Sequence, residues 1–353
     1  MINLSLTYLV KITKFIYYLF LFPFMALETI DLKDRKILYQ LDVNCRQSNS
    51  AIGKKVGLSK QVVDYRIRKL VNAGVIFRFA TVIDTYKLGF TKYKIYLSLE
   101  NTNTTRLREI IEYLKNHKKT EWVATCTGKW DLIASYLAKD VYEFNEAIKE
   151  LEEKFSYYLA SRETTITLGV PHWRKEYLLN NKEPYPVVYQ GGTAGNFTID
   201  AIDEEILKLM VNNARMPIME IAKRLKITPR IVHYRLKNLT KEKIILINRI
   251  FINFSQVNLI FCKAFFTFKN LTTGKYAQFF QYCNNLKNLT FLINCLGPWD
   301  VELEFEIDDF NKYHSTILDL KDKFAEIIRN YDFVIIVEDH KLDYYPGAYP
   351  VLH

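Results

Sequence analysis

Side chains that can hydrogen-bond to nucleic-acid bases recur in two short segments of this chain. Glutamine can bond adenine and arginine can bond guanine through two hydrogen bonds at once, and each such pair discriminates between bases by about 1–3 kcal/mol. The candidate base-contacting residues are Lys60, Gln61, Asp64, Tyr65 and Arg68 in the first segment, and Arg230, His233, Tyr234 and Lys237 in the second. The candidate phosphate-contacting residues, a few positions upstream, are Lys54, Lys55, Lys223 and Arg224. The alternative is that both segments are ordinary solvated surface, with the tyrosines packed on a helix surface.

The positive charge of the chain is concentrated around these segments. The 353 residues carry a net charge of +10. Residues 31–79 hold 11 Lys/Arg and 4 Asp/Glu, and residues 200–249 hold 11 and 6. The rest of the chain is therefore slightly acidic. We expect a polyanion to bind at the two basic segments.

An internal repeat places the two segments at equivalent positions. Asp31 begins a stretch that recurs at Asp200, an offset of 169 residues, without a gap. Between residues 31 and 76, 13 of 46 aligned pairs are identical. The sequence therefore predicts two copies of one unit of about 150 residues, joined in tandem.

The first part of each copy has helical spacing. Ile37, Leu38 and Leu41 form an apolar stripe behind the helix cap Asp31, and a second short helix leads to a tight turn. Ser59 can cap a third helix, whose inward residues are Val63, Ile67 and Leu70. The matching residues of the second copy are Asp200, Ile206, Leu207, Met210 and Thr228, with Pro229 as the first residue of the third helix. This order is typical of a helix-turn-helix head.

The second part of each copy changes to strand spacing. Residues 93–100 and 299–308 alternate between apolar and polar, which predicts strands with one buried face. Helical stripes at 107–114 and 144–155 lie between strands, giving the order strand, helix, strand, strand, helix, strand. This order predicts a ferredoxin-like βαββαβ domain with helices on one sheet face. The other face must be solvated or paired, and Tyr96 on it favours pairing.

The predicted fold is therefore α+β: two tandem units, each a three-helix, winged-helix-like head followed by a ferredoxin-like domain. The expected divisions are 1–28 (apolar segment), 29–79 (first head), 80–179 (first ferredoxin-like domain), 180–197 (linker), 198–248 (second head), 249–345 (second ferredoxin-like domain) and 346–353 (tail). The linker is predicted from its prolines and glycines, and the segment from Tyr344 to His353 is expected to lie irregularly on the surface.

The first 25 residues are apolar and fit no single explanation. The uncharged run from Phe15 to Leu27 is too short to span a bilayer as a helix. A mis-assigned start before Met25, a peripheral anchor and an export signal remain open, and we favour the first.

The five cysteines lack CxxC spacing. We expect them to be buried and reduced, in a cytoplasmic protein without stable membrane association.

These motifs together resemble the Lrp/AsnC family, the leucine-responsive or feast/famine transcriptional regulators. The head begins with Asp-x-x-Asp-x-x-Ile-Leu, its last helix reads Ser-x-x-Val-Val-x-Tyr-Arg-Ile-x-x-Leu, and Gly-Val-Ile follows. The resemblance covers residues 29–175 and 198–345. The chain departs from most members because it carries the unit twice, and Lys243-Ile244-Ile245 replaces the Gly74-Val75-Ile76 pattern in the second copy.

The resemblance implies a sequence-specific transcriptional regulator that binds double-stranded DNA and self-associates through its ferredoxin-like domains. The third helix of each head would enter the major groove. The two reading surfaces differ, so we expect a covalent pseudo-dimer that prefers two unlike half-sites. Arg66 and Arg235 are expected to tie this helix to nearby acids, with phosphate contact as the alternative. An architectural DNA-compacting protein is the alternative function.

The resemblance also implies a small effector, typically an amino acid, bound near a turn of the ferredoxin-like domain. The matching residues are Gly128, Trp130, Asp131, Gly297, Trp299 and Asp300. Glycine lets a ligand approach the backbone, and a carboxylate can pair with an ammonium group. The alternative is a tight turn whose tryptophans pack into the assembly interface. Pro298 removes one backbone donor, so the two turns need not be equally competent.

Catalysis has little support in the sequence. It has no Gly-x-Ser-x-Gly motif, no phosphate loop and no clustered metal ligands among its six histidines, so we expect no cofactor and no metal. The sirohaem decarboxylases also fuse an AsnC-like head to this kind of domain, and they carry a histidine-rich signature. The matching strand here, residues 122–130, has no histidine, so an enzyme of that kind is an unfavoured alternative.

Overall fold

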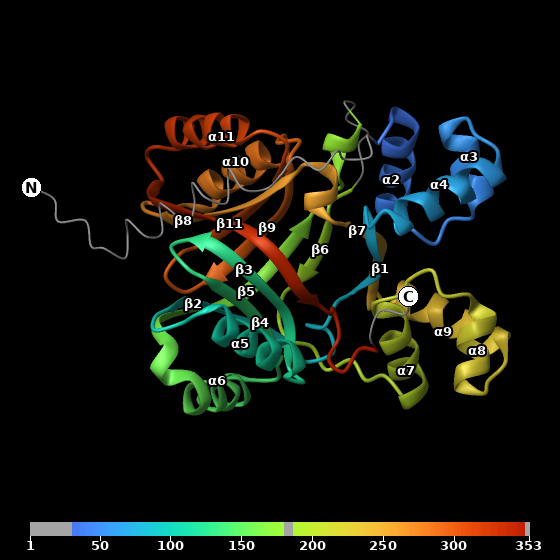
Figure 1. Cartoon of the computed structure of the whole chain (residues 1–353), viewed down its shortest axis with the longest axis horizontal. Coiled ribbons are helices and arrows are strands. Elements are labelled where there is room, and N and C mark those ends of the chain that lie inside the picture. The colour runs from blue at the N-terminus through green and yellow to red at the C-terminus, as the bar shows by residue number, and fades with distance from the viewer. Residues whose placement is uncertain (1–29, 180–185, 350–353) are drawn as a thin grey trace, which may run out of the picture.

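A computed structural model describes residues 30–179 and 186–349 of the chain. The predicted apolar segment 1–28 lies outside the described residues. The two heads lie beside each other on one side of the molecule, and the ferredoxin-like domains form the other side (Figure 1). The α+β fold with two tandem units is confirmed.

The first head consists of α2 (Leu32–Val43), α3 (Asn49–Val56) and α4 (Lys60–Asn72). The Asp31 side chain accepts a hydrogen bond from the Asp34 amide, and the Asp34 side chain accepts one from the Asp31 amide. Ser59 caps α4 as predicted. Gly57 ends α3 in the left-handed conformation, with φ 68°, which glycine adopts without a steric penalty. The predicted inward residues of α2 and α4 are all buried in one cluster.

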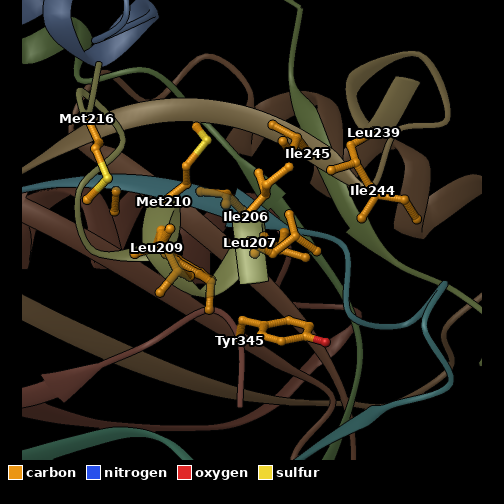
Figure 2. Close-up of a cluster of buried hydrophobic side chains, with 14 of the residues drawn as sticks. Ile206, Leu207, Leu209, Met210, Met216, Leu239, Ile244, Ile245 and Tyr345 are labelled. Carbon is orange, nitrogen blue, oxygen red and sulfur yellow. The ribbon is translucent and has the colours of Figure 1, made fainter. Parts of the chain in front are cut away.

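The second head repeats this plan with α7 (Ala201–Val211), α8 (Ile218–Leu225) and α9 (Pro229–Lys241). Asp200 and Thr228 cap α7 and α9, and Pro229 is the first residue of α9, as predicted. The core of this head is shown in Figure 2. It includes Tyr345, so the expectation of an irregular surface segment from Tyr344 onward is wrong at its start: Tyr344 and Tyr345 are both buried.

A two-stranded antiparallel ribbon joins the heads to each other. Strand β1 (Ile76–Ile83) follows the first head, β7 (Ile245–Ile252) follows the second, and the two pair along their length. The equivalent arginines Arg46 and Arg215 then reach across the boundary between the heads. Arg46 donates to the Ala214 carbonyl, 2.5 Å away, and Arg215 donates to the Asn49 side chain, 2.8 Å away. The two heads are therefore fixed relative to each other by the ribbon and by one arginine from each head.

Each ferredoxin-like domain has the predicted order of elements. The first comprises β2 (Thr91–Leu99), α5 (Thr104–Asn116), β3 (Thr120–Gly128), β4 (Leu132–Ala138), α6 (Val141–Phe155) and β5 (Leu159–His172). The second comprises β8 (Ile260–Phe268), α10 (Thr273–Cys283), β9 (Leu289–Leu296), β10 (Val301–Ile307), α11 (Phe310–Lys323) and β11 (Ile328–Leu342). Three short 3-10 turns lie at Ser156–Tyr158, Glu176–Leu178 and Phe254–Val257.

The two sheets close into one ring because β5 and β11 each cross from one copy to the other. Strand β5 pairs first with β2 of its own copy and then with β9 of the other copy. Strand β11 likewise pairs with β8 and then with β3. The ring order is β2-β4-β3-β11-β8-β10-β9-β5, with β5 returning to β2. A short strand, β6 (Val188–Gly191), adds to β5, so the expected linker 180–197 contains regular structure.

The helices cover only the outer faces of this ring, with α5 and α6 on one side and α10 and α11 on the opposite side (Figure 1). The inner faces of the two sheets pack against each other through a cluster that includes Tyr96, Trp130 and Trp299. Pairing of the second sheet face is confirmed, but the prediction that these strands have one buried face is wrong. Strand β10 is buried along its whole length, glutamates included, because the other copy's sheet covers it.

All five cysteines are buried, as predicted. No helix within residues 30–179 and 186–349 is long and apolar enough to cross a membrane.

Candidate nucleic-acid interface

The outer face of α4 carries the predicted base-contacting side chains. Lys60, Gln61 and Arg68 are exposed, and the Tyr65 side chain is 64% exposed, so its ring lies largely in solvent rather than packed on the helix. Capping by Ser59 fixes where this helix begins and therefore which face the four residues occupy. They occupy exposed positions from Lys60, the first residue of the helix, to Arg68.

Asp64 differs from the other predicted residues of this helix because it already has partners. It is half-buried, its carboxylate lies 2.7 Å from the Arg68 guanidinium, and it accepts a hydrogen bond of 3.0 Å from Asn49 of α3. This arrangement holds α3 against α4 and orients Arg68. The carboxylate is thus committed to contacts within the head.

The outer face of α9 presents a different set of groups at the same positions. Arg230, His233 and Lys237 are exposed, and Tyr234 is 61% exposed. The offset of 169 residues matches Arg230 with Gln61, and His233 with Asp64. A cation on α9 therefore stands where α4 has a neutral amide, and an imidazole stands where α4 has a carboxylate.

Arg66 and Arg235 fix these two helices to their heads. Arg66 lies 2.8 Å from both Asp31 and Asp34 at the start of α2. Arg235 lies 2.5 Å from Asp200 and 3.3 Å from Asp203 at the start of α7. Partial burial acts against ionisation of Asp31, but hydrogen bonds from the Asp34 amide and Arg66 outweigh it and lower the pKa of Asp31. The expected tie between the third helix and nearby acids is present in both heads.

The four candidate phosphate contacts end the second helix of each head. Lys54 and Lys55 of α3 and Lys223 and Arg224 of α8 are all exposed. Lys55 donates to Gln47, and Arg224 forms an i,i+4 pair with Glu220. Exposed pairs of this kind contribute little to stability, so they can exchange for phosphate contacts at small cost.

The two predicted effector turns are used by the fold itself. The Asp131 carboxylate accepts a hydrogen bond from the Leu99 amide at 2.8 Å, and Asp300 accepts one from the Phe268 amide at 2.6 Å. Each aspartate thus ties its turn to the end of the neighbouring strand. Trp130 is buried, and its ring centroid lies 5.1 Å from that of the equivalent Trp299.

The glycines of these turns allow close approach of the other copy. A Cβ atom on Gly128 would lie 3.0 Å from the Phe333 carbonyl oxygen in β11, and one on Gly297 would lie 2.8 Å from the Thr164 carbonyl oxygen in β5. The structure therefore accounts for the glycine, tryptophan and aspartate of both turns through contacts inside the protein. This matches the alternative of a tight turn with tryptophans in the interface between the copies.

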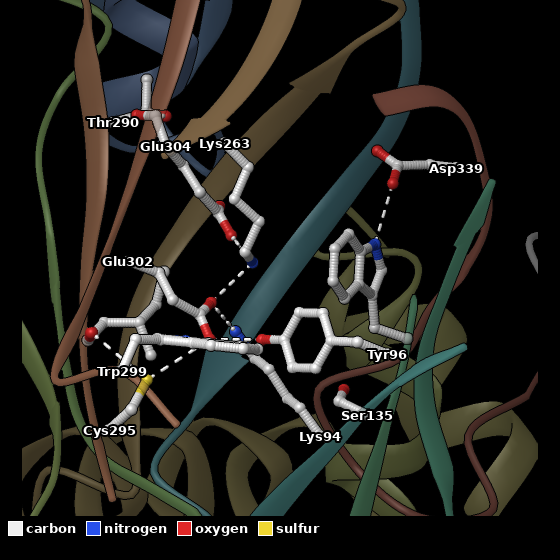
Figure 3. Close-up of polar contacts among 12 residues, drawn as sticks. Lys94, Tyr96, Ser135, Lys263, Thr290, Cys295, Trp299, Glu302, Glu304 and Asp339 are labelled. Atoms are coloured by element: carbon white, nitrogen blue, oxygen red, sulfur yellow. Dashed lines mark hydrogen bonds and ion pairs between the residues drawn. The ribbon is translucent and has the colours of Figure 1, made fainter. Parts of the chain in front are cut away.

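Between the two sheets lies a layer of buried charges that the sequence analysis missed. Glu302 lies 2.8 Å from Lys94 and 2.7 Å from Lys263, and it also accepts a hydrogen bond from Tyr96 (Figure 3). Burial raises the pKa of Glu302, but the two ammonium groups outweigh this effect and hold the pKa well below its ordinary range. Alternation of glutamates with apolar residues leaves open whether this face is solvated or paired. The repeat itself could have identified them, because two copies of one sheet domain can bury that face against each other.

A cavity of about 80 Å³ lies next to this charged layer, lined by Lys92, Glu121 and His172 among others. Its wall includes Phe251 of β7, so it lies at the end of the sheets nearest the heads. Small-molecule sites commonly measure about 300–1,000 Å³. No group of three or more potential metal-ligating side chains occurs within residues 30–179 and 186–349.

Comparisons with known proteins agree with this architecture. Residues 30–76 match a family described as winged helix-turn-helix DNA-binding, and residues 199–240 match the AsnC-type helix-turn-helix domain. A solved sirohaem decarboxylase, NirDL, covers 88% of this chain and 93% of its own with a TM-score of 0.58. Its sequence identity is 12%, so this likeness shows a shared fold only.

Two sequence relatives identify the family. A helix-turn-helix transcriptional regulator of Pyrococcus abyssi is 30% identical over 124 residues, which is 34% of this chain and 81% of the relative. The transcriptional regulator AzlB of Bacillus subtilis is 30% identical over 120 residues, 34% of this chain and 76% of the relative. Most of each relative thus matches about one third of this chain, as expected where the unit occurs twice. The chain belongs to the Lrp/AsnC family of helix-turn-helix transcriptional regulators and carries two DNA-binding units in tandem.

Proposed function

We propose that this regulator acts as a covalent pseudo-dimer whose two unlike heads read an operator with two unlike half-sites. The observation that carries the proposal is the difference between α4 and α9 on otherwise equivalent frames. Arg66 and Arg235 anchor the two helices to matching acidic pairs, so the differing residues occupy matching positions. Gln61 and Arg230 then offer different hydrogen-bonding groups to the bases.

Each head would place its third helix in the major groove. Gln61 suits an adenine and Arg230 suits a guanine, and each bidentate contact contributes about 1–3 kcal/mol of discrimination. Arg68, oriented by Asp64, supplies a second cation to the first half-site, whereas Lys237 takes the matching position in the second. Lys54, Lys55, Lys223 and Arg224 would contact phosphates and set the register without reading sequence.

Selection of binding sites from random DNA tests this proposal. The wild-type protein is expected to select sites whose two halves differ. A variant carrying Arg230→Gln, His233→Asp and Lys237→Arg gives α9 the equivalent residues of α4 and should select sites with more similar halves. Lys287→Gln, on an exposed residue between α10 and β9, is the matched control and should select wild-type sites. Strictly palindromic sites from the wild-type protein would contradict the proposal, and sequence-blind, steeply salt-dependent binding would favour the architectural alternative.

We also propose that a small effector, such as an amino acid, modulates DNA binding, and that the chain has no enzymatic activity. Family membership supports the effector. The exposed Gly128 and Lys129, and Gly297 and Pro298, leave the outer edges of the two turns accessible. The strand at residues 122–130, which matches the histidine-rich signature of the sirohaem decarboxylases, has no histidine, and this supports the absence of sirohaem chemistry. Thermal shifts measured with each of the twenty amino acids test the effector, and no shift with any of them would remove it. Haem binding on purification would favour the enzyme.

A further inference from the structure

The carboxylates buried between the two sheets do not follow the repeat, whereas two of the lysines near them, Lys94 and Lys263, are equivalent positions. Strand β10 of the second copy contributes Glu302, Glu304 and Glu306, which are 0%, 8% and 2% exposed. The equivalent residues of β4 in the first copy are Ile133, Ser135 and Leu137. Only the second copy therefore brings this row of carboxylates to the interface.

The cations that neutralise this row come largely from the first copy. Lys94 lies 2.8 Å from Glu302, and Lys175 lies 2.5 Å from Glu306. Lys263 of the second copy supplies the remaining cation, 2.7 Å from Glu302 and 2.6 Å from Glu304 (Figure 3). In the structure, three lysines therefore neutralise three carboxylates, and two of these lysines come from the first copy.

Two more buried polar contacts, between the heads and the β1–β7 ribbon, also join one copy to the other. Asp42 of the first head lies 2.8 Å from Arg249 of β7. In the repeat, the residue equivalent to Asp42 is Val211 and the residue equivalent to Arg249 is Ala80. Arg78 of β1 donates to Asn212 at 2.8 Å, and the position equivalent to Arg78 is Ile247. Each of these buried contacts joins one copy to the other, and each aligned position in the repeat is apolar.

The apolar residues of the interface do not distinguish a pair of unlike copies from a pair of like copies. Trp130 faces its equivalent Trp299, and Tyr96 faces its equivalent Phe265, so aromatic rings of similar size meet across the interface. The second units of two different molecules could bring the same kinds of ring together. Such a pair would, however, bury six carboxylates with only two copies of Lys263. A pair of first copies would bury Lys94 and Lys175 without Glu302 and Glu306. Unpaired buried charges are strongly destabilising.

We propose that these buried charges restrict pairing to unlike units, so that the first unit (residues 30–179) binds the second unit (residues 186–349) and neither binds another copy of itself. The inner sheet face of each unit is thus an interaction surface whose partner is the other half of this chain, in the same molecule or exchanged between two molecules. Every assembled pair then presents one α4 head and one α9 head. The inference concerns assembly and does not depend on the DNA sequence that the heads read.

The test starts from the full-length protein with a specific protease site inserted between residues 180 and 185. The folded protein is cut, unfolded in denaturant and refolded, and native mass spectrometry then measures the three pairs that the two units can form. Only the unlike pair is expected. Like pairs near their statistical share would overturn the proposal.

A variant tests whether the carboxylates are the cause. Glu302→Ile, Glu304→Ser and Glu306→Leu give β10 the equivalent residues of β4. Like pairs of the second unit should rise from undetected to a measurable share. If this variant does not refold, Glu304→Ser alone leaves the contacts of Glu302 and Glu306 in place and should produce a smaller rise. Glu326→Gln, on an exposed side chain, is the control and should leave only unlike pairs. No rise with the carboxylate variants would overturn the role of the charges.

Discussion

Asp42 and Arg249 form a buried ion pair in which a carboxylate oxygen and a guanidinium nitrogen lie 2.8 Å apart. The pair joins α2 of the first head to β7, which follows the second head. Asp42 also accepts a hydrogen bond from the Lys175 amide at 3.0 Å, and Arg249 donates to the Trp173 carbonyl at 3.1 Å. The first head, the strand that follows the second head and the segment after β5 therefore meet at this one contact.

Replacing Asp42 alone is expected to destabilise the protein strongly. Asp42→Val leaves the Arg249 guanidinium buried without its carboxylate, and breaking a buried pair in this way costs about 3–5 kcal/mol. Combining Asp42→Val with Arg249→Ala installs the equivalent residues of the repeat, Val211 and Ala80, and should cost less than Asp42→Val alone. Urea unfolding of the two single variants and the double variant measures this. A double variant whose loss equals the sum of the single losses would show that the pair contributes no coupling.

Asp339 gives the stability of the protein a defined pH dependence. Burial raises the pKa of Asp339 from 3.8 to about 6, the hydrogen bond from Trp122 opposes this shift, and the nearby charge of Glu304 adds to it. Between pH 4 and 6 the folded carboxyl keeps a proton that the unfolded chain has lost, so the free energy of unfolding falls as pH rises through this window.

Asp339→Asn should therefore stabilise the protein above pH 6 and have little effect near pH 4. The asparagine carbonyl can still accept the Trp122 hydrogen bond, while the charge is removed. Since Asp339 is only partly buried, we expect the free energy of unfolding to rise by roughly 1–2 kcal/mol at pH 7.5. Urea unfolding at about pH 4 and 7.5 measures the difference. Equal effects at both pH values would assign the change to packing rather than to ionisation.

Local features of this fold follow from the sequence, whereas contacts between the copies do not. The helix caps Asp31 and Ser59 and the tie of Arg66 to nearby acids depend on residues close together in the fold of one head, and the spacing predicts them. Alternation of period two at Glu302, Glu304 and Glu306 shows that one strand face differs from the other. It does not show whether water or a second sheet covers the polar face.

The partners of the buried glutamates explain why the ion pairs of this face could not be predicted from the strand pattern. Lys94 is 208 residues from Glu302, and Lys175 is 131 residues from Glu306. Such pairings arise only after β5 and β11 cross between the copies. The length of these two strands, 14 and 15 residues, is the structural feature that permits the crossing. The roles assigned to the exposed residues of α4 and α9 remain predictions.

The turn glycines should tolerate no side chain where the other copy approaches. Gly297→Ala places a methyl group 2.8 Å from the Thr164 carbonyl oxygen, and Gly128→Ala places one 3.0 Å from the Phe333 carbonyl oxygen. We expect each to lower the free energy of unfolding by about 1–3 kcal/mol, with the larger loss at Gly297. Gly274→Ala is the control, because no atom lies within 4 Å of the added methyl group at this position in α10. Thermal unfolding of the three variants distinguishes them, and unchanged stability in Gly297→Ala would contradict the close approach.

Arg66 and Lys54 should affect DNA binding in different ways. Arg66 is held by Asp31 and Asp34, so Arg66→Gln should loosen α4 and reduce affinity without changing the salt dependence. Its half-exposed contacts suggest a stability loss of about 1 kcal/mol or less.

Lys54 is exposed, and Lys54→Gln should lower the slope of log affinity against log salt by about 1 if it contacts a phosphate. Fluorescence anisotropy with one DNA duplex across a salt series measures both slopes. A slope lowered by Arg66→Gln would move Arg66 to the phosphate contacts, and an unchanged slope in Lys54→Gln would remove Lys54 from them.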